Sequence, residues 1–256
     1  MLRLYATGRI RVESPALTLD EGDLPSRQAR ALLAFLICER AHATAKEQLA
    51  EALWHEDLPK AWHSALKSLI SKLRRFLSEF GTVTGTAVIE SQFGCYQLRL
   101  PEGSWVDLEE AYNAIDRAEG MVRYADYDAA WGFVNVGLAI SRRPFLPGDD
   151  TPWVLQQRQQ IKDLLVRALD CYINICLNTN QETLAVKMSL EALELDHYRE
   201  TSYYNLMSSH MAAGNPAEAL RVYQSCKDVL SRELGVEPSS AIEGLHLQVL
   251  DTSIVS

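Results

Sequence analysis

The segment from Leu58 to Ser78 combines positive charge with small hydroxyl side chains. It contains no aspartate or glutamate and five cations: Lys60, Lys67, Lys72, Arg74 and Arg75. Serines stand between these cations, at Ser64, Ser68 and Ser71. Cations of this kind bind phosphate groups, and small hydroxyl groups reach base edges without holding a helix away from them. These residue types are typical of a surface that binds double-stranded DNA.

The apolar residues of this segment predict a helix from about Lys60 to Phe80. On an ideal helix with about 100° per residue, a buried face within about 60° is formed by Leu66, Ile70, Leu73 and Leu77, extended by Trp62, Leu69 and Phe76. The opposite side gathers Lys60, Ser64, Lys67, Ser68, Ser71 and Arg75, with Lys72 and Arg74 at its edges. We therefore expect a recognition helix, over about residues 60–78, that enters the major groove.

A basic helix can also be an ordinary solvated surface. A helix that is merely soluble usually mixes charges of both signs, because opposite charges four residues apart stabilise it. The lack of acidic residues between positions 58 and 78 favours a nucleic-acid surface over this alternative.

Short strands and two helices precede this segment, and a hairpin follows it. Residues 2–6, 9–12 and 16–19 predict the strands of a small antiparallel sheet. Ser26 is a good N-cap for a first helix, and Thr44 for a second. Gly81 and Gly85 end the basic helix, and residues 87–90 and 94–100 predict the hairpin. This order predicts an α+β winged helix-turn-helix domain over residues 1–100.

Two arginines near the start of the first helix are further candidate phosphate contacts. Arg27 and Arg30 follow the Ser26 cap, where backbone amide groups also attract anions. An ordinary surface position is the alternative for both. If about six cations neutralise phosphates, the affinity should fall with salt at a log–log slope of roughly −5.

Residues 101–256 predict an all-α domain of tetratricopeptide-like helical repeats. A shift of 34 residues pairs Leu169 with Tyr203, Tyr172 with Leu206, Ile173 with Met207, Asn180 with Gly214, Ala185 with Ala219 and Ala192 with Cys226. A third copy would place Ala125 at its turn and Ala130 at its small position, before the loop from Pro144 to Pro152. Three copies are about the minimum for a stable stack.

The two halves of the chain differ in net charge. Residues 1–100 hold 13 basic and 11 acidic side chains, whereas the remainder holds 12 basic and 23 acidic ones, net −11. A negatively charged half repels phosphate, so we expect it to bind a protein partner such as RNA polymerase or a neighbouring subunit.

Other classes of protein lack support in the sequence. It has no GxxxxGK, GxSxG or HExxH motif and no glycine-rich dinucleotide turn, so we expect no enzymatic activity and no cofactor. The five cysteines lack CxxC spacing and predict reduced thiols without a metal site. The Asp149-Asp150 pair is expected in a solvated turn. The longest apolar run, Ala31 to Cys38, is too short for a bilayer, and the N-terminus does not resemble a signal peptide, so we expect a cytoplasmic protein without a membrane partner.

Segments spread over nearly the whole chain resemble the Streptomyces antibiotic regulatory protein family, which joins an OmpR-type winged helix to a bacterial transcriptional activator domain. They are QARALLAFL (28–36), QLAEALW (48–54), SALKSLISKLRRFL (64–77), VDLEEAY (106–112), AGNPAEALRVYQ (213–224) and ELGVEPSSAIEGLH (233–246). The last of these, following a repeat, is the most specific. The resemblance implies a sequence-specific activator that binds promoter repeats with protomers side by side and contacts RNA polymerase.

By position, the resemblance also implies which residues read DNA. The reading face would consist of Ser64, Lys67, Ser68, Ser71, Lys72 and Arg75, and the wing would extend from Gln92 to Tyr96. The wing of this chain, SQFGCYQL, lacks the arginines common in the family, so the target sequence does not transfer. An uncharged wing leaves a second hypothesis open: a protein-interaction scaffold with tetratricopeptide-like repeats and an eroded DNA-binding domain.

Overall fold

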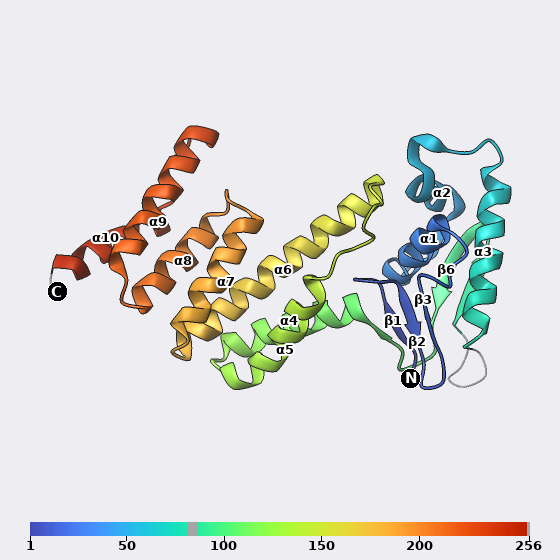
Figure 1. Cartoon of the computed structure of the whole chain (residues 1–256), viewed down its shortest axis with the longest axis horizontal. Helices are drawn as coiled ribbons and strands as arrows, with labels where there is room; N and C mark the ends of the chain where they lie inside the picture. Colours follow the sequence, from blue (N-terminus) through green and yellow to red (C-terminus); the bar gives the residue numbers. More distant parts are fainter. Residues whose placement is uncertain (81–86, 255–256) are drawn as a thin grey trace. The chain divides into compact units, whose positions relative to one another are not determined.

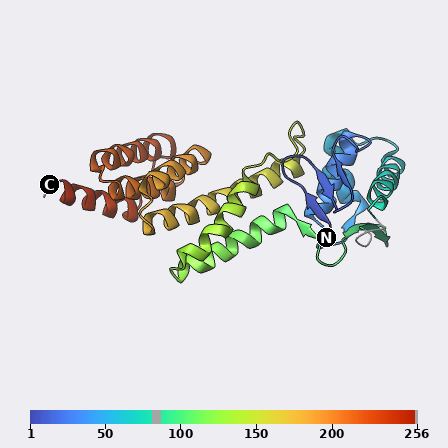
Figure 2. The same ribbon diagram turned by 60° about the horizontal axis from the view of Figure 1, so that its bottom comes forward.

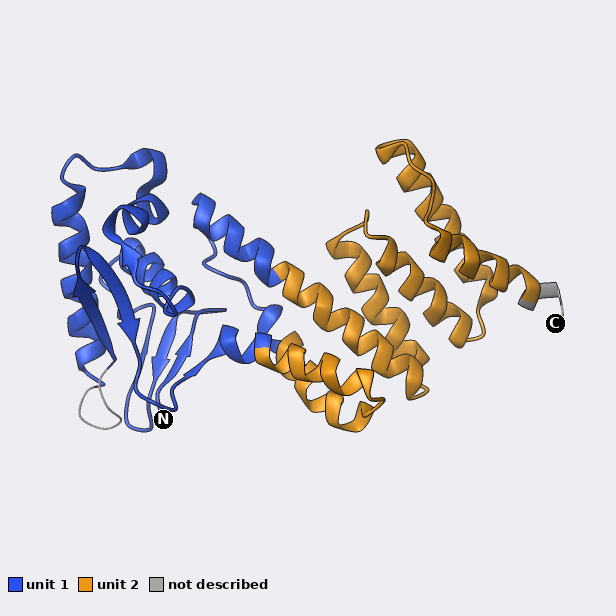
Figure 3. Cartoon of the chain, turned by 180° about the vertical axis from the view of Figure 1, so that it is seen from behind, with its two compact units in different colours: residues 1–112, 139–161 blue, residues 113–138, 162–256 orange. Residues whose placement is uncertain are grey.

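The structure is a computed structural model that describes residues 1–80 and 87–254. It divides into two compact units (Figure 3): unit 1 comprises Met1–Tyr112 and Ala139–Ile161, and unit 2 comprises Asn113–Leu138 and Lys162–Ser256. Residues 139–161 therefore belong to the same compact unit as the N-terminal residues, whereas the sequence predicts a single domain boundary near residue 100. The predicted helix break at Gly81 and Gly85 lies outside the described residues.

A four-stranded sheet, in the order β3-β2-β1-β7, opens unit 1. As predicted, β1 (Arg3–Tyr5), β2 (Arg11–Glu13) and β3 (Thr18–Asp20) form antiparallel pairs. The strand β7 (Trp105–Val106) adds to β1 in parallel and was not predicted, because two residues are too short to show a period.

A buried carboxylate joins this sheet to the helix α4 (Asp107–Arg123). Asp107 accepts hydrogen bonds from the backbone amides of Ala6, at 2.9 Å, and Thr7, at 3.0 Å, and from the Thr7 hydroxyl at 2.7 Å. It also accepts a bond of 2.8 Å from the amide of Leu108 in the first helical turn. These donors compensate for the burial of the charge and hold the start of α4 against β1.

Three helices follow the first three strands (Figure 1). The first, α1 (Arg27–Cys38), confirms the predicted cap, since the Ser26 hydroxyl accepts a hydrogen bond from the amide of Ala29 at 3.1 Å. The second, α2 (Lys46–Trp54), is followed by the short helix η1 (His55–Asp57), and α3 extends over Trp62–Ser78. The basic helix thus begins two residues later than predicted and leaves Lys60 in the preceding turn.

The predicted Thr44 cap is wrong. Thr44 lies in the strand β4 (Thr44–Ala45), where it pairs with Tyr96, and α2 begins after Ala45. The Gln48 side chain instead accepts a hydrogen bond of 3.1 Å from the amide of Ala45. Thr44 therefore pairs with a strand that is distant in the sequence, although the local sequence pattern predicts it as the helix cap.

The predicted hairpin consists of β5 (Val88–Gln92) and β6 (Cys95–Arg99). With β4 it forms a three-stranded sheet in the order β4-β6-β5, so β5 is an edge strand. The two turn residues, Phe93 and Gly94, have φ values of 50° and 81°. Positive φ at both positions suits a two-residue hairpin, although the Cβ of Phe93 makes this conformation cost about 1 kcal/mol.

The core of unit 1 draws on both of its chain segments. Leucines of α1 and α3, such as Leu32 and Leu73, belong to the same apolar cluster as Phe145, Leu146, Val154 and Ile161. The rings of Phe35 and Trp153 also pack together, with centroids 4.8 Å apart. Residues 139–161 therefore complete the core beneath α1.

The rest of the chain is helical (Figures 1 and 2). Its helices are α5 (Tyr127–Ser141), α6 (Pro152–Asn178), α7 (Glu182–Leu195), α8 (Glu200–Ala212), α9 (Pro216–Val229) and α10 (Ser240–Ile254), with the short π-helix η2 (Leu230–Leu234) after α9. Within unit 2, α8 packs against α7, α9 and α10. The protein is thus mostly helical, with its small sheets in the N-terminal unit.

The predicted 34-residue correspondence appears in equivalent helix ends. Asn180, after α6, and Gly214, after α8, both adopt left-handed backbone conformations, with φ values of 55° and 73°. The amide after each donates to the carbonyl five residues earlier: Gln181 to Cys176 at 2.9 Å and Asn215 to His210 at 2.8 Å. This pattern ends both helices in the same way.

The predicted third copy has the same helix end. Ala125 has a φ of 58°, and the amide of Asp126 donates to the carbonyl of Met121 at 3.0 Å. The small residues that follow the three turns, Ala130, Ala185 and Ala219, are all fully buried. Small side chains at these positions let neighbouring helices approach closely.

Candidate nucleic-acid interface

The residues predicted to read DNA lie on one exposed side of α3. We call Ser64, Lys67, Ser68, Ser71, Lys72 and Arg75 the basic face, and all six are exposed. Lys60 is exposed in the turn before α3. The structure therefore brings together on one helix the hydroxyl and cationic groups that the sequence pattern had grouped.

The opposite side of α3 holds the helix in place. Leu66, Ile70, Leu73 and Leu77 are each no more than 2% exposed, and α3 packs against α1, α2 and β5. Burying four such side chains contributes about 1.5–3 kcal/mol each. The basic face points outward because its opposite face is committed to the core.

The cations of the basic face are available for binding. Lys67, Lys72 and Arg75 form no ion pair with any residue that the structure describes, and the same holds for Lys60. A cation that already forms an ion pair would have to lose its partner before it could bind a phosphate. These four cations do not have this energetic cost with respect to residues 1–80 and 87–254.

Arg74, at the edge of the basic face, is different. Its Nε and Nη2 atoms donate to the carbonyl oxygen of Ile89 at 2.9 and 2.7 Å, and Nη2 also lies 3.2 Å from the Ser91 hydroxyl. The sequence pattern grouped Arg74 with the DNA-binding cations and held no sign of these bonds.

The predicted wing residues lie around the tip of the hairpin. Gln92 is exposed at the end of β5, and Tyr96 is partly buried in β6, where it pairs with Ser91 on one side and Thr44 on the other. Phe93, between them, is 95% exposed. The predicted wing includes Phe93 only as part of the range Gln92–Tyr96, although its place directly before Gly94 in the predicted turn was a usable signal for an exposed tip residue.

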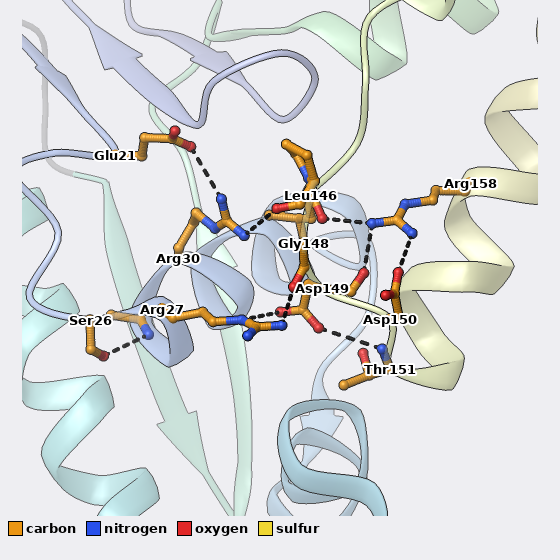
Figure 4. Close-up of polar contacts among 12 residues, drawn as sticks. Glu21, Ser26, Arg27, Arg30, Leu146, Gly148, Asp149, Asp150, Thr151 and Arg158 are labelled. Atoms are coloured by element: carbon orange, nitrogen blue, oxygen red, sulfur yellow. Dashed lines mark hydrogen bonds and ion pairs between the residues drawn. The ribbon is translucent and has the colours of Figure 1, made fainter.

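The structure does not leave Arg27 and Arg30 unpartnered at the start of α1 (Figure 4). Arg27 donates through Nη2 to the carbonyl oxygen of Gly148, and its Nε lies 3.7 Å from Asp149 Oδ2. Arg30 donates to the carbonyl oxygen of Pro147 at 3.1 Å and lies 3.7 Å from Glu21 Oε2. Both guanidinium groups thus bind the loop between α5 and α6, residues 142–151.

A third arginine binds this loop from α6. Arg158 donates to the carbonyl oxygen of Phe145 at 2.9 Å. It also donates to the carbonyl oxygens of Leu146 and Asp149 at 2.7 and 2.6 Å, and to Asp150 Oδ1 at 2.7 Å (Figure 4). The expectation that Asp149 is solvated is wrong, because this residue is only 5% exposed. Its carboxylate is buried beside Arg27, which compensates its charge.

Other chemistry has little support in the described part of the chain. All five cysteines are free thiols, and burial raises the pKa of Cys176 and Cys226 to about 11. No group of three or more histidine, cysteine or acidic residues is placed to hold a metal ion among the residues described. No described helix has both the length and the apolar character needed to span a bilayer.

Comparison with known proteins relates the chain to bacterial regulators. Residues 106–250 match the family model described as "Bacterial transcriptional activator domain". "Regulatory protein AfsR" of Streptomyces coelicolor is 30% identical over 251 residues, which cover 97% of this chain and 24% of the relative. "Transcriptional regulatory protein MoaR1" of Mycobacterium tuberculosis is 26% identical over 232 residues, which cover 89% of this chain and 73% of the relative. The chain thus spans about a quarter of the length of AfsR.

A solved structure has the same fold. Mycobacterium tuberculosis EmbR, in complex with a low affinity phosphopeptide, superposes with a TM-score of 0.85 at 19% identity, over 98% of this chain and 65% of EmbR. The family model covers more than half of the chain, and it begins just after the hairpin that follows the basic face. The chain therefore belongs to the bacterial transcriptional activator domain family and is a Streptomyces antibiotic regulatory protein family regulator.

Proposed function

We propose that this protein is a DNA-binding transcriptional activator that reads promoter sequence through the basic face of α3. The observation that carries the proposal is the combination of three exposed serines with cations that form no ion pair to a described residue, on a helix whose other side is buried. Serine hydroxyls donate to or accept from base edges in the major groove, and the cations bind the phosphates on either side. The proposal places this activity in the cytoplasm, where bacterial DNA is found.

The arrangement of unit 1 supports a winged helix-turn-helix. Three helices and a hairpin follow a small sheet, and α3 is the third helix, the position from which we infer that it enters the major groove. We assign the wing to Gln92–Tyr96, where Gln92 and Phe93 are the exposed side chains. An uncharged tip contacts DNA without adding to the salt dependence of binding.

We infer that residues 101–256 form a tetratricopeptide-like activator domain that binds protein. Their net charge of −11 disfavours contact with DNA. RNA polymerase and a neighbouring protomer on promoter repeats are the partners we propose. The names of the relatives, which are regulatory proteins, support a role in transcription.

Selection of bound duplexes from a random pool tests the proposal directly. We expect the full chain to enrich a defined sequence, and to enrich it as a tandem repeat if protomers bind side by side. Bound duplexes without a shared sequence would contradict sequence-specific reading. A pool that yields no bound duplex at low salt would contradict DNA binding altogether.

An interaction scaffold is the second candidate, and one observation favours it. The hairpin tip carries no charge and presents Phe93 almost fully to solvent, as a protein-binding hairpin would. Filter binding to a random-sequence duplex at low salt separates the two functions. Four unpaired cations predict measurable nonspecific binding, with a log–log salt slope of about −3.6 per protomer, whereas a scaffold predicts none.

A further inference from the structure

Arg74 stands apart from the other cations of α3 because its guanidinium group is bonded within the protein. Two of its nitrogen atoms converge on the carbonyl oxygen of Ile89, and one of them also reaches the Ser91 hydroxyl. Lys72, at the other edge of the basic face, forms no ion pair with a described residue. Two edge cations of the same helix thus have different surroundings.

The bonds of Arg74 lie close to the hairpin tip. Ile89 and Ser91 belong to β5, the edge strand of its sheet. An edge strand directs alternate carbonyl groups away from its neighbour, so they need another partner. The next residues along the chain, Gln92 and Phe93, form the exposed tip. Arg74 therefore links α3 to the hairpin immediately before the part that would touch DNA.

We propose that Arg74 is a positioning residue, which holds the hairpin beside the basic face and does not bind a phosphate. This inference rests on the proposed DNA-binding function. A helix and a hairpin that both contact one duplex bind more tightly when their relative placement is set in advance, because less freedom is lost on binding. Arg74 supplies this placement through a planar, forked group that makes several hydrogen bonds in fixed directions.

The chemistry of lysine distinguishes the two roles. A lysine at position 74 keeps the positive charge that a phosphate contact needs. Its single ammonium group lacks the planar fork with which arginine reaches the Ile89 carbonyl and the Ser91 hydroxyl together. If Arg74 binds a phosphate, R74K should therefore retain DNA affinity. If Arg74 positions the hairpin, R74K should lose it.

The test compares R74K and R74A with K72A in the full chain, using the duplex selected by the wild-type protein. We expect R74K and R74A each to bind about tenfold more weakly than wild type, because bonds from a charged donor are lost. The salt slope should stay unchanged in both variants, because a positioning Arg74 binds no phosphate itself and the tip of the hairpin that it holds is uncharged. The control K72A should lower the magnitude of the slope by about 0.9.

Hydrogen–deuterium exchange provides a readout that does not depend on DNA. In the free protein, R74K should speed exchange of the amides of residues 88–92 several-fold relative to wild type, whereas K72A should leave them unchanged. R74K with wild-type affinity, together with an R74A slope reduced by about 0.9, would overturn the positioning role in favour of a phosphate contact. Unchanged exchange in R74K would also overturn it.

Failure of this inference differs from failure of the proposed function. If the wild-type chain binds no duplex, DNA binding itself is refuted. If the wild-type chain binds and R74K binds equally well, only the role of Arg74 is refuted.

Discussion

The arginines at the start of α1 and the cations along α3 look alike in the sequence and differ in their partners. Arg27 and Arg30 bind carbonyl oxygens and acidic groups, most of them in the α5–α6 loop. Lys67 and Arg75 form no ion pair with a described residue. One group of charges is bonded within unit 1, and the other is exposed without an ion pair to any described residue.

The difference changes the expected strength of DNA binding. The sequence predicts about six phosphate contacts from seven candidate cations. Without the bonded Arg27, Arg30 and Arg74, four candidates are left that form no ion pair with a described residue: Lys60, Lys67, Lys72 and Arg75. The salt slope expected for one protomer accordingly changes from roughly −5 to about −3.6. The number of cations in a sequence segment is therefore an upper limit on the number that can bind a partner.

The largest effect, on stability, is expected from R158A. This substitution removes the arginine of α6 that binds the α5–α6 loop, the loop that Arg27 and Arg30 also bind. Three backbone carbonyls would lose a charged donor, so the free energy of unfolding should fall by about 3 kcal/mol. Chemical denaturation measures this change. A loss below about 1 kcal/mol would show that the loop is held by its apolar contacts instead.

The double variant K67A/R75A tests the unpaired group. We expect affinity for the selected duplex to fall about 50-fold, and the magnitude of the salt slope to fall by about 1.8, because two phosphate contacts are lost. Fluorescence anisotropy over a salt series measures both. Unfolding should be unaffected, since both side chains are exposed. Unchanged affinity would refute the assignment of α3 as the recognition helix.

R30A tests the bonded group. The Arg30 side chain is only 16% exposed, and its loss leaves the Pro147 carbonyl without this donor, so stability should fall by about 1–2 kcal/mol. Duplex affinity at a temperature well below the unfolding midpoint should change by less than about twofold. The opposite pattern, with stability kept and binding lost, would move Arg30 into the DNA interface.

A smaller effect is expected at Cys95, which is partly exposed next to the hairpin tip. If the wing lies against DNA as proposed, a bound duplex should slow the alkylation of Cys95 by iodoacetamide at pH 8 about threefold, as judged by peptide mass spectrometry. Cys226 is the internal control: burial raises its pKa to about 11, so little reactive thiolate exists at pH 8 with or without DNA. Equal Cys95 rates in both states would argue against a wing contact.

The sequence predicted correctly those elements that depend on residues close together in the chain. The Ser26 cap, the two faces of α3 and the hairpin follow from residues close together in the chain, and all three agree with the structure. The equivalent helix ends at Asn180 and Gly214 also follow from spacing, because each is closed by backbone bonds within its own turn.

Long-range partners account for the predictions that were wrong or missing. Thr44 has the right side chain for a cap but pairs with Tyr96. Asp149 follows a proline and a glycine that suit a solvated turn, yet it is buried beside Arg27. The burial of Asp107 against β1 and the bonds from Arg74 to β5 had no local signal. Each depends on residues brought together only by folding.

The sequence by itself determined that α3 has an apolar side and a cationic, serine-bearing side, because helical periodicity is a property of neighbouring residues. It also determined family membership, through segments that extend over both halves of the chain. Only the tertiary structure decided which cations remain unpaired. A charge is neutralised by whatever group lies within a few ångströms, and for Arg27, Arg30 and Arg74 that group comes from a distant part of the chain.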